Sequence, residues 1–144
     1  APGHAQNLIL NGGFENPQIA FNANLITVPA GSGTLTNWSV GGHSIDLIRN
    51  YWTPRSGTQS IDLSGTGAVN AAGSISQTVN VVAGKRYALD FWMAGNPVGG
   101  AKIKKMDILL DGAPTFTNVT FDTTGKTRTN MGWQFRHFQF TAAT

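Results

Sequence analysis

The chain lacks the periodicity of an α-helix. No window of eleven or more residues keeps apolar side chains at the i, i+3, i+4 and i+7 positions without a Gly or Pro inside it. Apolar and polar residues alternate instead, most clearly over 75–81, 87–94 and 106–110. Such alternation is typical of β-strands with one buried face. The sequence therefore predicts an all-β fold of about eight to ten short strands.

A hairpin signal joins two of these segments. Asp111-Gly112 lies between the alternating stretch 106–110 and a return stretch over 117–121. Both turn residues tolerate the positive φ that a two-residue hairpin requires. Because short alternating segments separated by polar turns recur along the chain, the expected architecture is a two-sheet antiparallel β-sandwich or jelly roll.

The phase of the alternation changes near the C-terminus. Trp133 and Phe135 share one phase, whereas Phe138 and Phe140 share the other. A one-residue slip moves every following side chain to the opposite face of a sheet. This predicts either a β-bulge near 136–137 or two short strands that belong to different sheets.

Composition excludes several classes of protein. With 144 residues, 40% of them hydrophobic, the chain is long enough for one domain over 1–144 with its own core. No apolar run approaches the ~20 residues of a membrane-spanning helix. A net charge of +3 is too small and diffuse for a dedicated nucleic-acid binder, and the lack of Cys excludes disulfides and thiolate metal sites. Abundant Gly, Thr, Asn and Ser with only 12% charged residues is typical of secreted all-β modules.

A series of short motifs carries a family resemblance. The N-terminal stretch 7–17 reads Asn-Leu-Ile-Leu-Asn-Gly-Gly-Phe-Glu-Asn-Pro, and further motifs follow in order at 35–42, 45–48, 51–52, 59–65, 73–78, 94–97, 121–126 and 131–133. This order strongly resembles the bacterial choice-of-anchor C family, kin of plant cell-wall proteins that share a similar domain of unknown function. The resemblance covers essentially the whole chain. It implies an extracellular, non-catalytic, galactose-binding-domain-like jelly roll that binds polysaccharide.

The chain departs from that family at its end. Family members continue with another strand and a closing segment, whereas this sequence stops at Thr144. The expected sandwich would therefore lack its last one or two strands and expose backbone edges. Either the sequence is a fragment, or a second chain or a neighbouring copy in a homo-oligomer supplies the missing strand. The last possibility gives the alternative function, a structural or adhesive cell-surface module assembled by strand completion.

One loop region is richest in the residue types that bind sugars. Carbohydrate sites combine aromatic faces with planar hydrogen-bonding side chains. Tyr51 and Trp52 are adjacent in a loop and cannot both face the core, so at least one is expected to be exposed and to stack on a sugar. The alternative is that Trp52 closes the end of the sandwich. The expected hydroxyl partners are His43, Asp46, Asn50 and Arg55.

Other aromatic residues give a second candidate site. Trp133 enters a strand directly from a turn and could form a rim with Asn96 and Arg128. Trp92 alternates with Phe91, so it is expected on the opposite sheet face, either open to a glycan or covered by a loop. Trp38 is expected in the core.

The resemblance also implies a calcium site. In similar modules the Glu of the opening motif, here Glu15, ligates a structural Ca²⁺ together with backbone carbonyls and an Asp of the closing segment, which this chain does not contain. Calcium requires six to eight oxygen ligands. The alternative is that Glu15 accepts backbone N–H bonds from Gly12-Gly13 or pairs with a Lys.

Enzyme signals are weak. Asp46 and Asp62, on neighbouring strands, could supply the two carboxylates of a glycosidase, but their Ser-Ile-Asp-Leu context is an ordinary strand pattern. The three His lack metal-ligand spacing, and no nucleophile elbow or phosphate loop is present. The Lys-rich stretch 102–105 is most simply a solvated strand edge, or a contact for an acidic polysaccharide. The sequence therefore predicts a secreted, non-catalytic carbohydrate-binding module.

Overall fold

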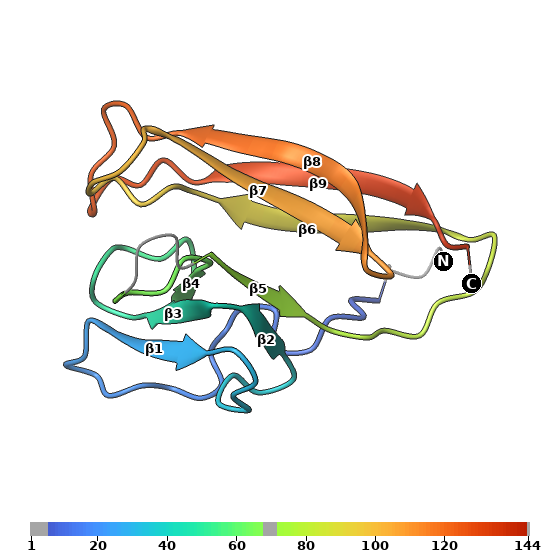
Figure 1. The fold of residues 1–144 in the computed structure, drawn as a ribbon, viewed down its shortest axis with the longest axis horizontal. Coiled ribbons are helices and arrows are strands. Elements are labelled where there is room, and N and C mark those ends of the chain that lie inside the picture. The colour runs from blue at the N-terminus through green and yellow to red at the C-terminus, as the bar shows by residue number, and fades with distance from the viewer. Residues whose placement is uncertain (1–5, 68–71, 144) are drawn as a thin grey trace. The chain divides into compact units, whose positions relative to one another are not determined.

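A computed structural model describes residues 6–67 and 72–143, and these residues form an all-β structure (Figure 1). The β1–β3, β2–β5, β3–β4 and β7–β8 ladders are antiparallel, as the sequence predicted. Within the described residues there is no helix of the length and apolarity that crossing a membrane would need. The strands are β1 (Leu25–Pro29), β2 (Ser39–Gly42), β3 (Ser44–Ile48), β4 (Ser60–Asp62), β5 (Gly73–Ser76), β6 (Arg86–Met93), β7 (Ile103–Leu110), β8 (Ala113–Asp122) and β9 (Gln134–Thr141).

The chain divides into two compact units. The first comprises Ala1–Tyr87 with Thr141–Thr144, and the second comprises Ala88–Phe140. Whether these units make up one domain, as the sequence analysis expected, stays a prediction. Each unit is described by itself below.

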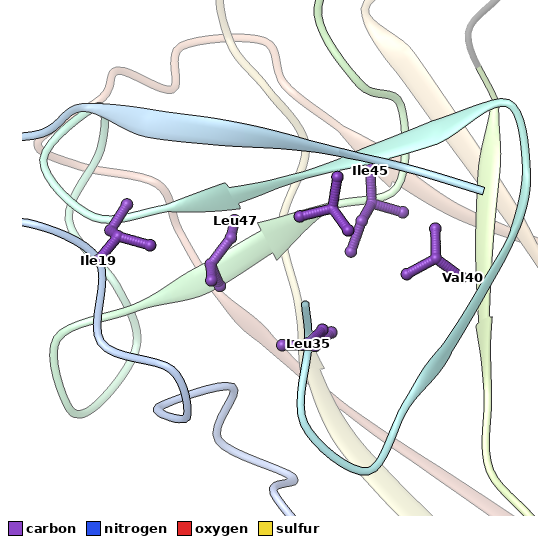
Figure 2. Close-up of a cluster of buried hydrophobic side chains, with 6 residues drawn as sticks. Ile19, Leu35, Val40, Ile45 and Leu47 are labelled. Atoms are coloured by element: carbon purple, nitrogen blue, oxygen red, sulfur yellow. The ribbon is translucent and has the colours of Figure 1, made fainter. Parts of the chain in front are cut away.

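The first unit is centred on β3. This strand lies between β1 and β4 in an antiparallel sheet, and all five of its residues are buried. Ile45 and Leu47 of β3 pack with Leu35, Val40 and Ile19 in the main apolar cluster, as Figure 2 shows. Full burial of each such side chain contributes roughly 1.5–3 kcal/mol to folding. Apolar burial around β3 is therefore the main source of stability in this unit.

Two glycines let other chain segments approach β3 closely. A Cβ at Gly73 would overlap the carbonyl of Ser44, and a Cβ at Gly65 would overlap the Ser44 side chain. The N–H of Gly73 donates to the carbonyl of Leu63, and the N–H of Gly65 donates to that of Ser44. The absence of a side chain at these two positions therefore allows the backbone to pack directly on the strand.

The second unit contains the predicted hairpin. β7 and β8 pair antiparallel, and Asp111-Gly112 turns between them with φ angles of 49° and 77°. The register shifts on either side of Ile108, where Asn118 of β8 has φ 54° and donates its N–H to Asp107 Oδ1. The β7–β8 ladder therefore accommodates two extra residues on β8, one at each register shift.

The expectation for the C-terminal segment was wrong. Residues 134–141 form one continuous strand, β9, in which exposed and half-buried residues alternate from Phe135 to Thr141. Phe138 and Phe140 lie on the half-buried face, whereas Phe135 is exposed beside His137 on the opposite face. The apparent change of phase arose because Phe135 is an outward-facing aromatic residue, which hydrophobicity alone does not distinguish from a core residue.

Candidate functional site

The outward face of β6 and β9 carries four neighbouring side chains, which we call the β6–β9 platform: Asp90, Trp92, Phe135 and His137. All four belong to the second unit. Trp92 is 43% exposed and Phe135 is 51% exposed, and the side chains of His137 and Asp90 are 45% and 46% exposed. All four residues are thus about half exposed, so the platform is accessible to solvent.

Strand alternation explains why these residues share one face. Asp90 and Trp92 are two positions apart in β6, and Phe135 and His137 are two positions apart in β9. The rings of Trp92 and Phe135 lie 5.4 Å apart at 56°, while Asp90 Oδ1 is hydrogen-bonded to His137 Nδ1. A step of two residues forward in β6, from Asp90 to Trp92, is matched by a step of two residues back in β9, from His137 to Phe135. This is the pairing of an antiparallel ladder. The platform is therefore two successive cross-strand pairs.

The other face of these strands anchors the platform. Phe91 stacks on Phe138 with ring centroids 5.9 Å apart, and Phe116 of β8 contacts Phe138 at 4.8 Å. Arg136 Nη2 donates to the carbonyl of Thr120 at 2.8 Å, so that β8 is tied to β9. Aromatic pairs of this kind stabilise a structure by about 0.5–1.5 kcal/mol beyond their buried area. The platform thus stands on a packed and hydrogen-bonded support.

The hydrogen-bonded pair of Asp90 and His137 gives the platform a directed polar group. The bond from Asp90 to Nδ1 fixes the rotation of the His137 ring, so Nε2 lies on the far side of the imidazole from the carboxylate. The His137 ring is also nearly parallel to that of Phe135, with centroids 6.5 Å apart and planes at 27°. This arrangement offers an apolar surface next to an oriented ring nitrogen. A ligand with one apolar face and hydroxyl groups at its edges fits such chemistry.

The structure revises the role predicted for Trp52. Its side chain is only 6% exposed, and Nε1 donates to Ser60 Oγ at 2.7 Å inside the first unit. The edge of Tyr51, which is half-buried, lies against it with ring centroids 5.6 Å apart. A covered indole has no face on which a sugar can stack. Trp52 is therefore part of the packed interior, the alternative considered from the sequence.

The role predicted for Asp46 is also revised. This residue is 2% exposed, and its carboxylate accepts hydrogen bonds from Thr27 Oγ1 at 2.7 Å and from Thr66 N and Oγ1 at 3.0 and 2.5 Å. Both oxygens are already occupied by protein donors. Asp46 therefore joins three segments of the first unit and is not placed to meet a sugar hydroxyl.

The remaining residues of that loop region have mixed environments. Asn50 Nδ2 donates to the carbonyls of Phe21 and Ala23 at 2.7 and 2.8 Å, which uses both of its N–H groups to brace the 19–24 loop. His43 is exposed, with Nδ1 3.1 Å from Ser44 Oγ, and Arg55 is exposed. The region between 43 and 55 is thus held mainly by internal contacts.

The second predicted site lies at one end of the second unit. Asn96 Oδ1 accepts a hydrogen bond from the N–H of Val98 at 3.0 Å. Trp133 is half-buried immediately before β9, and Arg128 is exposed in the preceding turn. The structure thus places these three residues in the loops beside the Trp92–Phe135 end of the platform, and their predicted role in binding stays a prediction.

Glu15 is surrounded by hydrogen-bond donors. Its carboxylate accepts bonds from Thr58 N, Thr58 Oγ1 and Gln59 N at 2.8, 2.6 and 3.1 Å, and from Gln18 Nε2 at 2.6 Å. Burial by itself raises the pKa of Glu15, but the hydrogen bonds from Thr58, Gln59 and Gln18 outweigh it and lower that pKa below its ordinary value. Gly57, with φ 62°, permits this approach because a Cβ there would overlap Glu15 Oε1.

These contacts do not favour calcium at Glu15. A calcium ligand needs other oxygens facing it, whereas N–H and O–H donors converge on this carboxylate. Over residues 6–67 and 72–143 no group of three or more His, Asp or Glu side chains could hold a metal ion. The backbone N–H donors to Glu15 are those of Thr58 and Gln59, and not those of Gly12-Gly13 as the alternative drawn from the sequence had it.

Sequence reasoning singled out only one member of the platform. It placed Trp92 on the outward face of its strand, and the structure agrees. It did not propose Asp90, Phe135 or His137 as ligand-binding residues. A signal was present, because Asp90 and Trp92 are two positions apart and so are Phe135 and His137, which places each pair on one face of its strand. Recognising the platform also requires knowing that β6 pairs with β9.

Comparison with known proteins gives a family but no ligand. A family model described as "Protein of unknown function (DUF642)" matches residues 7–144. One relative is the Halomucin of Haloquadratum walsbyi (strain DSM 16790 / HBSQ001), 39% identical over 99 residues, which amount to 67% of this chain and 1% of that protein. The chain thus spans a very small part of the relative's length. No solved structure shows a significant match.

Proposed function

The chain belongs to the DUF642 family, and we propose that it acts as an extracellular, non-catalytic module that binds carbohydrate through the β6–β9 platform. The observation that carries this proposal is the row of outward side chains in which the exposed rings of Trp92 and Phe135 adjoin the Asp90–His137 pair. The resemblance to choice-of-anchor C proteins and the relative named a halomucin support an extracellular setting. We also propose that the fold is a jelly roll.

The platform residues have complementary roles in the proposed binding. The C–H face of a pyranose ring packs on Trp92 and Phe135, which are 43% and 51% exposed. The Nε2 atom of His137 exchanges a hydrogen bond with a hydroxyl group at the edge of the sugar. Asp90 holds the imidazole in the orientation that this bond requires. No covalent step is involved.

A glycan array followed by calorimetry tests the proposal. We expect wild-type protein to bind a subset of glycans and the Phe135→Ala variant to bind them at least about tenfold more weakly, as for a central aromatic anchor. The matched control is Phe21→Ala, which removes an 81% exposed Phe from the first unit and should leave binding unchanged. Absence of any glycan ligand, or equal binding by wild type and Phe135→Ala, would refute the platform.

The alternative of a structural or adhesive module completed by a second chain stays a prediction. It requires a stable assembly in which another copy or another polypeptide donates a strand. Light scattering of the purified protein tests it directly. A monomer that keeps its fold would exclude this alternative and leave the carbohydrate proposal unaffected.

A further inference from the structure

From a bulge on β8 we propose that Asn118 is a modification site, the acceptor of an asparagine-linked oligosaccharide. This inference goes beyond the proposed function, with which it shares the extracellular setting. It concerns a sugar attached covalently to the chain, whereas the platform is proposed to bind glycans without a covalent bond.

The sequence contains two matches to the acceptor pattern Asn-x-Ser/Thr, in which x is any residue except Pro. They are Asn37-Trp38-Ser39 and Asn118-Val119-Thr120. Such a pattern marks the Asn side chains that receive an oligosaccharide in secreted proteins, where the sugar lies on the surface. The pattern is short, so the environment of each Asn has to show whether the folded chain can carry the sugar.

The modification is a group transfer to the side-chain amide. Nδ2 of Asn118 forms a bond to the anomeric carbon of an oligosaccharide that a membrane lipid carries through a diphosphate group. The bond from that carbon to the diphosphate breaks, and the lipid diphosphate leaves with the electron pair. The amide gives up one proton to the transferase, and nothing is oxidised or reduced.

Asn118 lies in a β-bulge that interrupts the regular ladder. At the first register shift β7 has the single residue Asp107, whereas β8 has both Thr117 and Asn118. The N–H of Asn118 donates to Asp107 Oδ1 at 2.9 Å, and its φ is 54°, a left-handed conformation that Asn tolerates better than most residues. The bulge therefore involves the backbone of Asn118 and the side chain of Asp107.

The side chain of Asn118 is open to a substituent. The residue is exposed, and its amide makes no hydrogen bond with residues 6–67 or 72–143. By contrast, Asn11 and Asn50 each use Nδ2 to donate to two backbone carbonyls. An oligosaccharide on Nδ2 of Asn118 would therefore break no hydrogen bond of the folded chain.

The third residue of the pattern is open as well. Thr120 is exposed, and its carbonyl accepts a hydrogen bond from Arg136 Nη2 at 2.8 Å, whereas its hydroxyl makes none with the part of the chain that the structure describes. Val119 between them is half-buried and pairs with Met106 of β7. The fold thus uses the backbone and the Val119 side chain, and leaves the amide and the hydroxyl to solvent.

The pattern at 37–39 is less suited to be an acceptor. Asn37 is also exposed, but the ring of Trp38 packs against Phe14 with centroids 5.8 Å apart, and its Nε1 donates to the carbonyl of Asn11 at 2.9 Å. Drawing this segment into a transferase would expose an indole, which costs more than exposing the side chain of Val119. Asn118 is therefore the favoured acceptor.

Mass spectrometry of the protein purified from the cells that naturally produce it tests the proposal. Trypsin releases the peptide 106–126, in which Asn118 is the only Asn. We expect this peptide to carry the added mass of an oligosaccharide, and electron-transfer fragmentation to place that mass on Asn118. The same fragmentation distinguishes attachment to the Thr hydroxyls of this peptide.

Variants expressed in a eukaryotic secretion host assign the acceptor. Thr120→Ala keeps Asn118 and should lose the oligosaccharide completely, whereas Thr120→Ser retains a hydroxyl and should keep it. Asn118→Asp removes the amide, tolerates the same φ and should lose the oligosaccharide as well. Thr117→Ala, which removes an exposed hydroxyl outside the pattern, is the matched control and should be modified like the wild type. Thermal melting of each variant confirms that it is folded.

The outcomes separate this inference from the proposed function. A peptide 106–126 without sugar in the naturally produced protein overturns the inference, as does sugar on Asn37 alone or on a Thr of this peptide. Loss of the oligosaccharide in Thr117→Ala but not in Thr120→Ala has the same meaning. Each of these results leaves the platform standing, because its test is the binding of free glycans. If Phe135→Ala does not weaken that binding, the proposed function fails and the assignment of Asn118 is unaffected.

Discussion

Removing the charge of Glu15 should destabilise the first unit by an amount that depends on pH. The variant Glu15→Gln keeps the shape of the side chain but replaces one acceptor oxygen by an NH2 group that faces donors of the 57–59 segment. A hydrogen bond to a buried charged group contributes about 1.5–3 kcal/mol. Because Glu15 is only partly buried, solvent screening reduces this, and we expect the four bonds together to contribute about 1–2 kcal/mol.

The pH dependence follows from the direction of the pKa shift. The pKa of Glu15 is lower in the folded protein than its ordinary value of 4.5, so the folded state favours the ionised form. The resulting stability is fully present above the pKa of the unfolded chain and is lost as pH falls through the folded pKa. Urea denaturation of wild type and Glu15→Gln between about pH 7 and about pH 3 should therefore show a difference that is constant near neutrality and disappears in acid.

The control is Asp111→Asn, which removes an exposed carboxylate at the β7–β8 turn and keeps a residue that tolerates the φ of 49° there. It should change stability by less than about 0.5 kcal/mol, as surface substitutions do. A Glu15→Gln effect that persists unchanged in acid would refute the argument from hydrogen bonding to the ionised carboxylate. An effect no larger than that of Asp111→Asn would refute the magnitude.

Three further predictions concern the first unit. Trp52→Ala should lower the free energy of unfolding by about 3–5 kcal/mol in chemical denaturation, because it empties a buried site and leaves Ser60 Oγ without the indole donor. An effect below about 1 kcal/mol would contradict the burial of Trp52. Gly57→Ala should cost at least about 1 kcal/mol in the same measurement, since φ is 62° and the added Cβ overlaps Glu15; unchanged stability would contradict that close approach. The melting temperature should be the same in millimolar Ca²⁺ and in EDTA, and a calcium-dependent rise that Glu15→Gln abolishes would restore the metal site that the family resemblance implied.

Features set by local sequence could be predicted. The β-structure follows from alternation, and the turn at Asp111-Gly112 follows from the φ that these residues tolerate. The outward direction of Trp92 follows from its place between the inward-facing Phe91 and Met93. Each depends on residues close together in the chain. The family match, in turn, confirms the relation to proteins with this domain of unknown function over 7–144.

Features set by pairing could not be predicted. Asp46 is buried because β3 lies between β1 and β4, and its oxygens bond to Thr27 and Thr66, each at least 19 residues away in the chain. The platform requires β6 beside β9, some 45 residues apart, which alternation within either strand does not reveal. Phe135 in particular can be recognised as a surface residue only when its neighbour across the ladder is known.

The central position of β3 has a consequence for the dynamics of the first unit. Its backbone amides are hydrogen-bonded into ladders on both sides and its five side chains are buried. Amide hydrogens of such a strand exchange with solvent only through the largest opening of the unit. Ile45, Leu47 and Ile48 should therefore exchange most slowly, and their rates should report the global stability of this unit.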